Sequence, residues 1–173
     1  MRRDPSVQGL LITGVFGSGK SSVAEEIADI LEKRSAPYAI LDLDWLGWFD
    51  TGTDDGPSEY RVMLTNLVDV VGNYLDIGVR YFVLARHVRD VSELESLKAE
   101  VPLPLRIVRL TASLEEIKRR LSANVTTGRQ DDLRRATLQV ESSEGEGIEE
   151  VTVANDRSIR QVAMEVLDRI GWS

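Results

Sequence analysis

The stretch Gly14-Val15-Phe16-Gly17-Ser18-Gly19-Lys20-Ser21 is the part of the sequence that decides the fold. It has the pattern glycine, any four residues, glycine, lysine, serine, and it lies between a predicted strand at 7–13 and a predicted helix at 23–34. Glycines allow a tight turn with inward-pointing N–H groups, and the start of the following helix adds partial positive charge. We therefore expect this stretch to bind phosphate groups.

Two side chains of the stretch have specific expected parts in that binding. Lys20 supplies a mobile positive charge for the β- and γ-phosphates of a nucleotide, and the Ser21 hydroxyl is a ligand for Mg²⁺. The alternative is a glycine-rich turn whose lysine is merely exposed, and the glycines together with the flanking elements argue against it. The residues expected to contact the nucleotide are Gly14, Gly17, Ser18, Gly19, Lys20, Ser21 and Ser22.

Strands and helices alternate along the rest of the chain. Short apolar runs predict strands, and apolar residues that recur every three or four positions predict helices. This alternation is typical of a parallel sheet with helices on both faces, in which ligands bind beyond the carboxyl ends of the strands. We expect an α/β fold with five parallel strands in a single domain over 1–173. The predicted strands are 7–13, 38–41, 79–85, 105–110 and 148–154, and the predicted helices are 23–34, 58–78, one from 90 or 92 to before 102, one from 113, one ending near 142, and 159–170.

Composition limits the classes of function. The chain has 173 residues, a formal charge of −8, one histidine and no cysteine. Negative charge opposes nucleic-acid binding through the general field of the molecule, and the lack of cysteine removes disulfides and thiolate metal sites. The apolar run at 7–12 is too short for a membrane span. These features predict a cytoplasmic protein that binds no nucleic acid and no membrane, and they leave open a monomer or a homodimer.

A pair of carboxylates follows the second predicted strand. Asp42 lies 22 residues after Lys20, so the pair should emerge at the sheet edge that carries the phosphate-binding stretch. Side chains alternate along a strand, which predicts that Asp42 and Asp44 point the same way. We expect Asp42 to hold Mg²⁺ and Asp44 to bind an acceptor hydroxyl and take its proton. The alternative is a solvated strand end with two surface acids.

Two tryptophans follow the acid pair. Trp45 and Trp48 come directly after Asp44, where their rings can stack on a ring of the acceptor. Such a site would suit a hydroxylated aromatic compound, a nucleoside or a natural product. Packing of the tryptophans within a local apolar cluster is an equal alternative.

The third predicted strand ends in basic residues, where many ATPases with the same phosphate-binding stretch carry an acidic one. Arg86 and Arg89 lie at the expected ligand edge, where they either bind an anionic group of the acceptor or cap the next helix. His87 is a less favoured general base than Asp44, because a lone histidine near a strand end is more often structural.

Through these motifs the sequence resembles the small-molecule and nucleotide kinases of the P-loop superfamily, which include adenylylsulfate kinase, gluconate kinase, shikimate kinase and chloramphenicol phosphotransferase. The resemblance covers nearly the whole chain, with 14–21 matching the Walker A loop and 42–44 the Asp-x-Asp motif. It implies the three-layer α/β/α P-loop NTPase fold, ATP and Mg²⁺ as cofactors, and a small lid at about 120–135. It also implies an adenine contact near Asn155 and Arg157.

The lid has a physical basis of its own. The stretch 124–131 is polar and bracketed by arginines, so it can close over a nucleotide, exclude water and bring a guanidinium to the transferring phosphoryl group. We expect Arg129 and Arg120 in that role. The alternative for Arg119 and Arg120 is pairing with the acids at 115–116 on a solvated helix, and Arg129 lies beyond their reach.

The sequence therefore predicts an ATP- and Mg²⁺-dependent phosphotransferase with a hydroxyl-bearing small molecule as acceptor. The alternative is an ATP-binding regulatory module that hydrolyses slowly or not at all. No acceptor transfers from the related families. Adenylylsulfate kinases carry an arginine close after Asp-Gly-Asp, whereas this chain continues from Asp44 with Trp45, and the histidine-proline of gluconate kinases and the glycine triplet of shikimate kinases are missing.

Overall fold

A computed structural model describes residues 7–53, 58–122 and 129–172 of the chain. One sheet runs through the molecule in the strand order β2-β3-β1-β4-β5, and all its neighbouring strands are parallel. This confirms the predicted α/β fold with a five-stranded parallel sheet. The strands are β1 (Gln8–Thr13), β2 (Tyr38–Asp42), β3 (Tyr81–Ala85), β4 (Leu105–Thr111) and β5 (Val151–Ala154).

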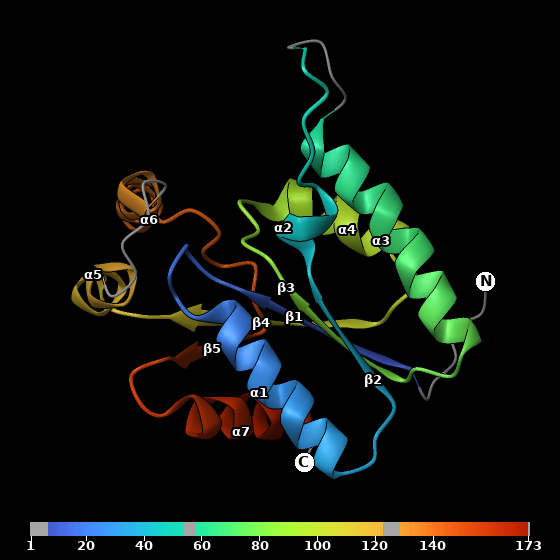
Figure 1. The fold of residues 1–173 in the computed structure, drawn as a ribbon. Coiled ribbons are helices and arrows are strands. Elements are labelled where there is room, and N and C mark those ends of the chain that lie inside the picture. The colour runs from blue at the N-terminus through green and yellow to red at the C-terminus, as the bar shows by residue number, and fades with distance from the viewer. Residues whose placement is uncertain (1–6, 54–57, 123–128, 173) are drawn as a thin grey trace.

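Helices cover both faces of the sheet (Figure 1). One face packs against α1 (Lys20–Lys33) and α7 (Ile159–Ile170) through a core of buried aliphatic side chains. The other face packs against α3 (Glu59–Asp76) and α4 (Val91–Glu100) through a second buried cluster. The strands are therefore apolar on both sides, as a parallel sheet between two helical layers requires.

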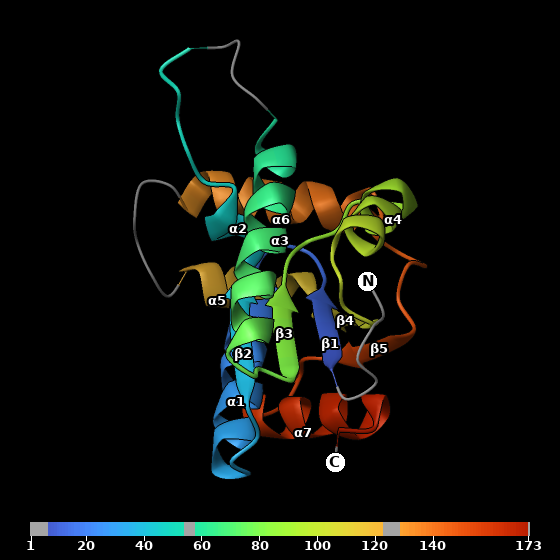
Figure 2. The ribbon, with the colours of Figure 1, turned by 90° about the vertical axis from the view of Figure 1, so that its right-hand side faces the viewer.

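Three further helices lie toward the carboxyl ends of the strands. They are α2 (Leu43–Leu46), α5 (Leu114–Ser122) and α6 (Arg129–Glu141). Figure 1 and Figure 2 show α6 beyond the end of the sheet to which β1 points. The ligand-binding edge expected for such a sheet is thus surrounded by the loop after β1 and by these helices.

Local sequence signals set several helix boundaries. The Asp90 side chain accepts a hydrogen bond from the Glu93 amide at 2.9 Å and caps α4. Ser158 and Gln161 form a capping box at the start of α7, and Gly171 ends that helix with a φ of 76°. Of the two starts expected for α4, at 90 or 92, the structure has the one at Asp90, and the end of α7 expected at 170 is confirmed.

Two local expectations differ from the structure. β5 begins at Val151 rather than at 148, and the chain turns into the short helix α2 at Leu43. The side chain of Asp42, the last residue of β2, accepts a hydrogen bond from the Asp44 amide and starts that helix. The lid expected at about 120–135 consists largely of the end of α5 and the start of α6, and 123–128 lie outside the described residues.

In the described ranges, no helix combines the length and the apolar character needed to cross a membrane.

Candidate active site

The loop after β1 packs closely against its neighbours at its glycines. Gly19 has a φ of 96° and is the N-cap residue of α1. A Cβ atom at this position would collide with the side-chain amide of Asn155. Only glycine combines this left-handed backbone with that close approach, so the loop geometry depends directly on the glycine pattern in the sequence.

Lys20 is held inside this loop. Its Nζ atom donates hydrogen bonds of 3.0 Å to the carbonyl oxygens of Gly14 and Val15. Burial lowers the pKa of Lys20 to about 8, although the nearby carboxylates of Asp44 and Asp42 act to raise it. The ammonium group is therefore positioned and poorly hydrated, which suits a site that pairs it with an anionic ligand.

Asn155 and Arg120 both hold the loop through a single carbonyl. The carbonyl oxygen of Ser18 accepts hydrogen bonds from Asn155 Nδ2 at 2.8 Å and from Arg120 Nη1 at 3.1 Å. Arg120 also donates to the Asn155 carbonyl at 2.8 Å and to Glu116 at 2.7 Å. The resemblance implied an adenine contact near Asn155. Asn155 is only 2% exposed, and its side chain binds the loop instead of facing solvent.

The acid pair lies beside the loop, but for a different reason from the one expected. Asp42 Oδ2 accepts a hydrogen bond from Ser21 Oγ at 2.8 Å, and Asp42 Oδ1 accepts from the Asp44 amide at 3.2 Å. The prediction that strand alternation aligns the two carboxylates was wrong, because β2 ends at Asp42 and Asp44 belongs to α2. A capping turn, rather than a strand, brings the two carboxylates to the same edge.

Arg86 connects Asp44 to a buried carboxylate that the sequence analysis missed. Its guanidinium lies 2.9 Å from Asp44 Oδ1 and 3.3 Å from Glu93 Oε1, and the Glu93 side chain is only 4% exposed. Glu93 Oε2 also accepts a hydrogen bond from the Arg89 amide at 2.8 Å and lies 3.4 Å from Arg89 Nε. Arg86 and Arg89, both expected to bind the acceptor, are thus engaged with protein carboxylates.

Tyr60 completes this polar cluster. Its hydroxyl donates to the Glu93 carbonyl at 2.6 Å, and the Arg86 guanidinium lies 5.4 Å from the centre of its ring. Burial, followed by the charge of Glu93, raises the pKa of Tyr60 to about 12. A usable sequence signal for Glu93 existed, since Asp90 and Glu93 have the spacing of a helix cap and its third residue.

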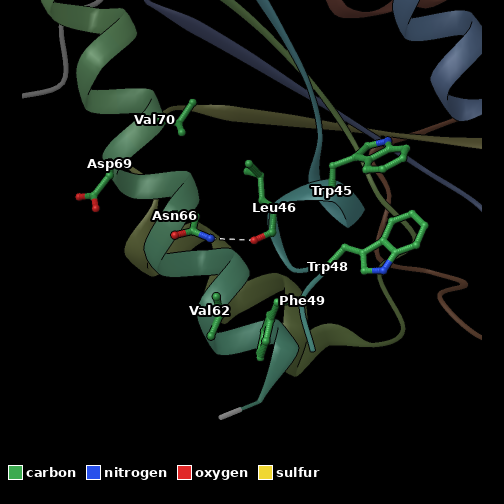
Figure 3. A pocket seen from close by; sticks show the side chains of 8 residues that line it. All are labelled: Trp45, Leu46, Trp48, Phe49, Val62, Asn66, Asp69 and Val70. Carbon is green, nitrogen blue, oxygen red and sulfur yellow. Dashed lines mark hydrogen bonds between the residues drawn. The ribbon is translucent and has the colours of Figure 1, made fainter. Parts of the chain in front are cut away.

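The two tryptophans after Asp44 are on the surface. Trp45 is 68% exposed and Trp48 is 73% exposed, and their rings stack with centroids 4.9 Å apart. Figure 3 shows both indoles projecting to the same side, away from Asp69 on α3. The two rings therefore contact each other at the surface and are not part of the buried core.

An apolar pocket of about 360 Å³ lies between this segment and the outer side of α3 (Figure 3). Asn66 Nδ2 donates to the Leu46 carbonyl across it at 2.8 Å. The residues that line it are Trp45, Leu46, Trp48, Phe49, Val62, Asn66, Asp69 and Val70.

The helix α6 contacts the phosphate-binding loop directly. The Phe16 amide donates to Gln139 Oε1 at 2.8 Å, and the Arg135 guanidinium lies 5.9 Å from the Phe16 ring centre. The charge of Arg135 also lowers the pKa of Lys20. The sequence did not predict Arg135 or Gln139 at the site. Their contacts form only when α6 packs against the loop, and no local sequence motif indicates such contacts.

Three further arginines that the sequence analysis weighed for the site differ in their surroundings. Arg129 begins α6, and its side chain lies outside the described part of the structure. Arg119 pairs with Glu116 at 2.7 Å, which lowers the pKa of that carboxyl to about 2. Arg157 pairs with Glu165 and with Asp156 rather than projecting freely.

The residues present fit a nucleotide and a magnesium ion. A side chain at Gly14, Gly17 or Gly19 would collide with neighbouring atoms. The buried Ser18 hydroxyl has no hydrogen-bond partner among the described residues. Ser21 and Asp42 offer the oxygen ligands that Mg²⁺ prefers. Within the described ranges, no group of three or more acidic, histidine or cysteine side chains forms a metal cage, but Mg²⁺ with phosphates needs only one or two carboxylates.

No family model and no curated protein matches the chain. Solved structures do match it. A sugar kinase from Janibacter sp. HTCC2649 has a TM-score of 0.70 and 18% identity over 95% of both chains. A gluconokinase from Sinorhizobium meliloti 1021 has a TM-score of 0.63 and 21% identity, covering 99% of this chain and 94% of its own. The APS kinase CysC of Mycobacterium tuberculosis has a TM-score of 0.60 and 22% identity, covering 97% of this chain and 99% of its own.

These similarities identify the fold as that of the P-loop small-molecule kinases. The fold resemblance predicted from the Walker A loop and the acid pair is therefore confirmed. A shared fold does not by itself assign a reaction, so the chemistry has to come from the site.

Proposed function

We propose that this protein is an ATP- and Mg²⁺-dependent phosphotransferase that moves the γ-phosphoryl group of ATP to a hydroxyl group of a small molecule. The observation that carries this proposal is the position of the acid pair. Asp42 is hydrogen-bonded to Ser21 of the phosphate-binding loop, and the charges of both Asp42 and Asp44 act on Lys20. A carboxylate so close to the phosphate lysine is what the activation of an acceptor hydroxyl requires.

The loop residues bind and orient the phosphates in this proposal. Lys20 is already aligned by two loop carbonyls, and the start of α1 directly after Gly19 adds the partial positive charge of a helix N-terminus. Charge stabilisation by groups that are fixed before the reaction avoids the cost of reorganising them during it.

Ser21 and Asp42 are the proposed protein ligands of Mg²⁺. The bound ion supplies positive charge to the phosphate oxygens and keeps the reacting groups aligned. Apart from that, Ser21 and Asp42 hold each other in place through their 2.8 Å hydrogen bond.

Asp44 is the proposed general base. The acceptor oxygen forms a bond to the γ-phosphorus while the bond from that phosphorus to the β–γ bridging oxygen breaks and ADP leaves. Asp44 takes the proton that the hydroxyl loses, and the Arg86 guanidinium at 2.9 Å fixes the direction of the carboxylate.

Arginines supply the remaining positive charge. Arg129 and Arg120 are the proposed stabilisers of the transferred group, as the sequence predicted, and Arg120 additionally holds the loop through Ser18. Arg135 joins them, because its charge already acts on Lys20.

Trp45 and Trp48 are the proposed acceptor-binding side chains. Two stacked indoles with 68% and 73% exposure, adjacent in sequence to Asp44, form a flat apolar surface beside the base. This supports an acceptor that carries a planar or apolar ring as well as a hydroxyl group.

An assay of ADP release with Mg-ATP across hydroxylated aromatics, nucleosides, sugars and aminoglycosides tests the proposal. Each compound needs a control without acceptor, and mass spectrometry identifies any phosphorylated product. Acceptor-stimulated ADP release with phosphate on the acceptor is the expected result. Release that is equally slow with every compound, while ATP binds, would count against the proposal.

That negative outcome would favour a second function, an ATP-binding regulatory module. The observation in its favour is the contact of Gln139 and Arg135 with Phe16, which joins α6 to the loop. Nucleotide binding at the loop would then change the position of α6 without phosphoryl transfer. Hydrogen exchange of α6 with and without Mg-ADP measures such a change.

A further inference from the structure

One backbone carbonyl of the phosphate-binding loop contacts two side chains that can donate hydrogen bonds to it. The Gly14 oxygen accepts a hydrogen bond from Lys20 Nζ at 3.0 Å and lies 3.1 Å from Nδ1 of His87. The imidazole side chain is only 9% exposed, and its other nitrogen, Nε2, lies 3.5 Å from Glu144 Oε2. His87 therefore stands between the loop and the connection from α6 to β5.

A neutral imidazole carries one ring N–H, but each ring nitrogen of His87 lies beside an oxygen that can accept a hydrogen bond. A carbonyl oxygen only accepts, so the contact with Gly14 is a hydrogen bond only when Nδ1 is protonated. In the neutral ring, Nε2 then has a lone pair that faces a carboxylate, and Nε2 indeed has no hydrogen-bond partner among the described residues. Only the doubly protonated ring donates to Gly14 and Glu144 together.

The backbone around Glu144 supports this contact. Gly145 has a φ of 74°, and a Cβ atom there would collide with the carbonyl oxygen of Val88. The segment after α6 consequently lies directly against the segment after β3. Glu144 is thus held near His87 by the backbone of its neighbour rather than by chance rotation of a long side chain.

The charged groups that act on the ring are Lys20 and Glu144. Burial and the charge of Lys20 lower the pKa of His87, whereas Glu144 acts to raise it. Arg86, the preceding residue, is directed toward Asp44 and Glu93. Burial and the ammonium group that shares its carbonyl therefore oppose a positive charge on the ring.

We propose that His87 is a positioning residue that takes up one proton when a nucleotide binds, and that its ring then bridges Gly14 of the loop and Glu144. This inference rests on the proposed nucleotide binding. The phosphates bring negative charge next to Lys20, which offsets the repulsion between Lys20 and an imidazolium ion. The proton comes from solvent, and the gained hydrogen bond to Glu144 fixes the loop.

Thermodynamic linkage gives the size of the effect. If nucleotide binding favours protonation of His87, protonation favours nucleotide binding by the same factor. A pKa rise of about one unit corresponds to binding about tenfold tighter at a pH below both pKa values than at a pH above them.

Nuclear magnetic resonance tests this directly, because the chain has a single histidine and its imidazole signals need no assignment. The His87 pKa is measured by pH titration without ligand and with saturating Mg-ADP. The amide signals of the loop glycines in the same samples report whether Mg-ADP is bound. We expect bound Mg-ADP to raise the His87 pKa by at least about half a unit, a roughly threefold linkage.

Two variants separate the bridge from a general effect of charge. Glu144→Gln removes the carboxylate and is expected to reduce the rise, whereas Glu141→Gln, at an exposed site at the end of α6, is expected to leave it unchanged. Calorimetry of Mg-ADP binding in two buffers of different ionisation enthalpy counts the proton, and His87→Asn should abolish the uptake.

The failure of this inference is distinct from the failure of the proposed function. Loop signals that shift with Mg-ADP, together with an unchanged His87 pKa, would overturn the proton uptake and leave nucleotide binding intact. Loop signals that do not respond to Mg-ADP would overturn both. A rise that is the same in Glu144→Gln would overturn the bridge to Glu144.

Discussion

The Arg86 guanidinium lies 2.9 Å from Asp44 Oδ1 and 3.3 Å from the buried carboxylate of Glu93. The proposed base is therefore held by an arginine that is itself anchored in the interior. Such indirect support fixes a reacting group more firmly than a surface ion pair does, because the arginine loses freedom through burial and not only through the pairing.

Arg86→Gln tests this support. We expect the rate of transfer to fall by about tenfold or more, with little change in nucleotide affinity, because misplacement of a reacting group slows the reaction without altering phosphate binding. Arg86→Lys should be intermediate, since it keeps the charge and loses the two-sided fork. Steady-state kinetics of both variants measure this. Arg61→Gln, on an exposed ion pair with Glu100, is the matched control.

The same change should also lower stability. Removing Arg86 leaves Glu93 with one charged partner fewer in a buried position, which costs about 1–3 kcal/mol. The double variant Arg86→Gln with Glu93→Gln should recover part of that loss in denaturant unfolding, but none of the activity. Recovery of activity in the double variant would show that Arg86 matters for folding alone.

Gly19→Ala should disrupt the loop. Alanine in a left-handed backbone costs about 1–2 kcal/mol, and here its methyl group also collides with Asn155. Gly78→Ala is a matched control, because Gly78 has a similar φ of 94° and its missing Cβ would meet nothing within 4 Å. We expect both variants to lose stability and only Gly19→Ala to lose nucleotide affinity, measured by calorimetry. Equal losses of affinity would contradict the crowding argument.

Lys20→Met should abolish nucleotide binding and yet stabilise the free protein at pH 7. The pKa of Lys20 falls from 10.5 to about 8 on folding, so the unfolded chain binds more protons between these values. Stability therefore rises with pH through that window, and the penalty of burying the ammonium is fully present below pH 8. We expect a gain of about 1–3 kcal/mol for Lys20→Met at pH 7.

Denaturant unfolding at pH 7 and pH 10 checks both parts of the Lys20 prediction. The advantage of Lys20→Met over the native chain should shrink at pH 10, whereas Lys33→Met at the exposed end of α1 should show no such gain. A Lys20→Met variant that is less stable than the native chain at pH 7 would refute the account of Lys20 burial.

Trp48→Ala should change acceptor binding without changing stability. The Trp48 ring is 73% exposed, so its removal costs little packing energy. Trp172, by contrast, is 5% exposed and packs edge-on against Tyr81, and Trp172→Ala should lower the melting temperature. Thermal unfolding and the KM for the acceptor separate the two roles. A large loss of stability in Trp48→Ala would place that ring in the core.

Local patterns were sufficient for most of the fold. The glycine-lysine-serine pattern predicted the loop between β1 and α1, and apolar periodicity predicted α7 up to Gly171. Asp44 was predicted at the correct edge of the sheet, but for the wrong reason. The chain does not continue as a strand after Asp42, whose side chain instead caps the helix that contains Asp44. A single capping residue favours the start of a helix over continuation of the strand by only a small free energy. The periodicity of apolar residues gives no information about that free energy.

Contacts between segments that are far apart in the chain could not be predicted from the sequence. Gln139 reaches Phe16 across 123 positions, and Arg120 reaches Asn155 across 35. These contacts depend on how α5 and α6 pack beyond the end of the sheet. The identity of a polar residue on a helix does not indicate which distant residue it will contact. The sequence left two alternatives for the tryptophans; their exposure places them outside the core, and acceptor binding by them stays a prediction.

The central claim is that Asp44 and the phosphate-binding loop together transfer a phosphoryl group to an acceptor. The most direct measurement counts ADP and phosphorylated acceptor in a single turnover, for the native chain, Asp44→Asn and the control Asp29→Asn at an exposed position of α1. We predict equal amounts of the two products for the native chain and Asp29→Asn, and for Asp44→Asn intact Mg-ATP binding with transfer slower by about 10²–10⁴. Undiminished transfer in Asp44→Asn, or ADP formed without phosphorylated acceptor, would contradict the account.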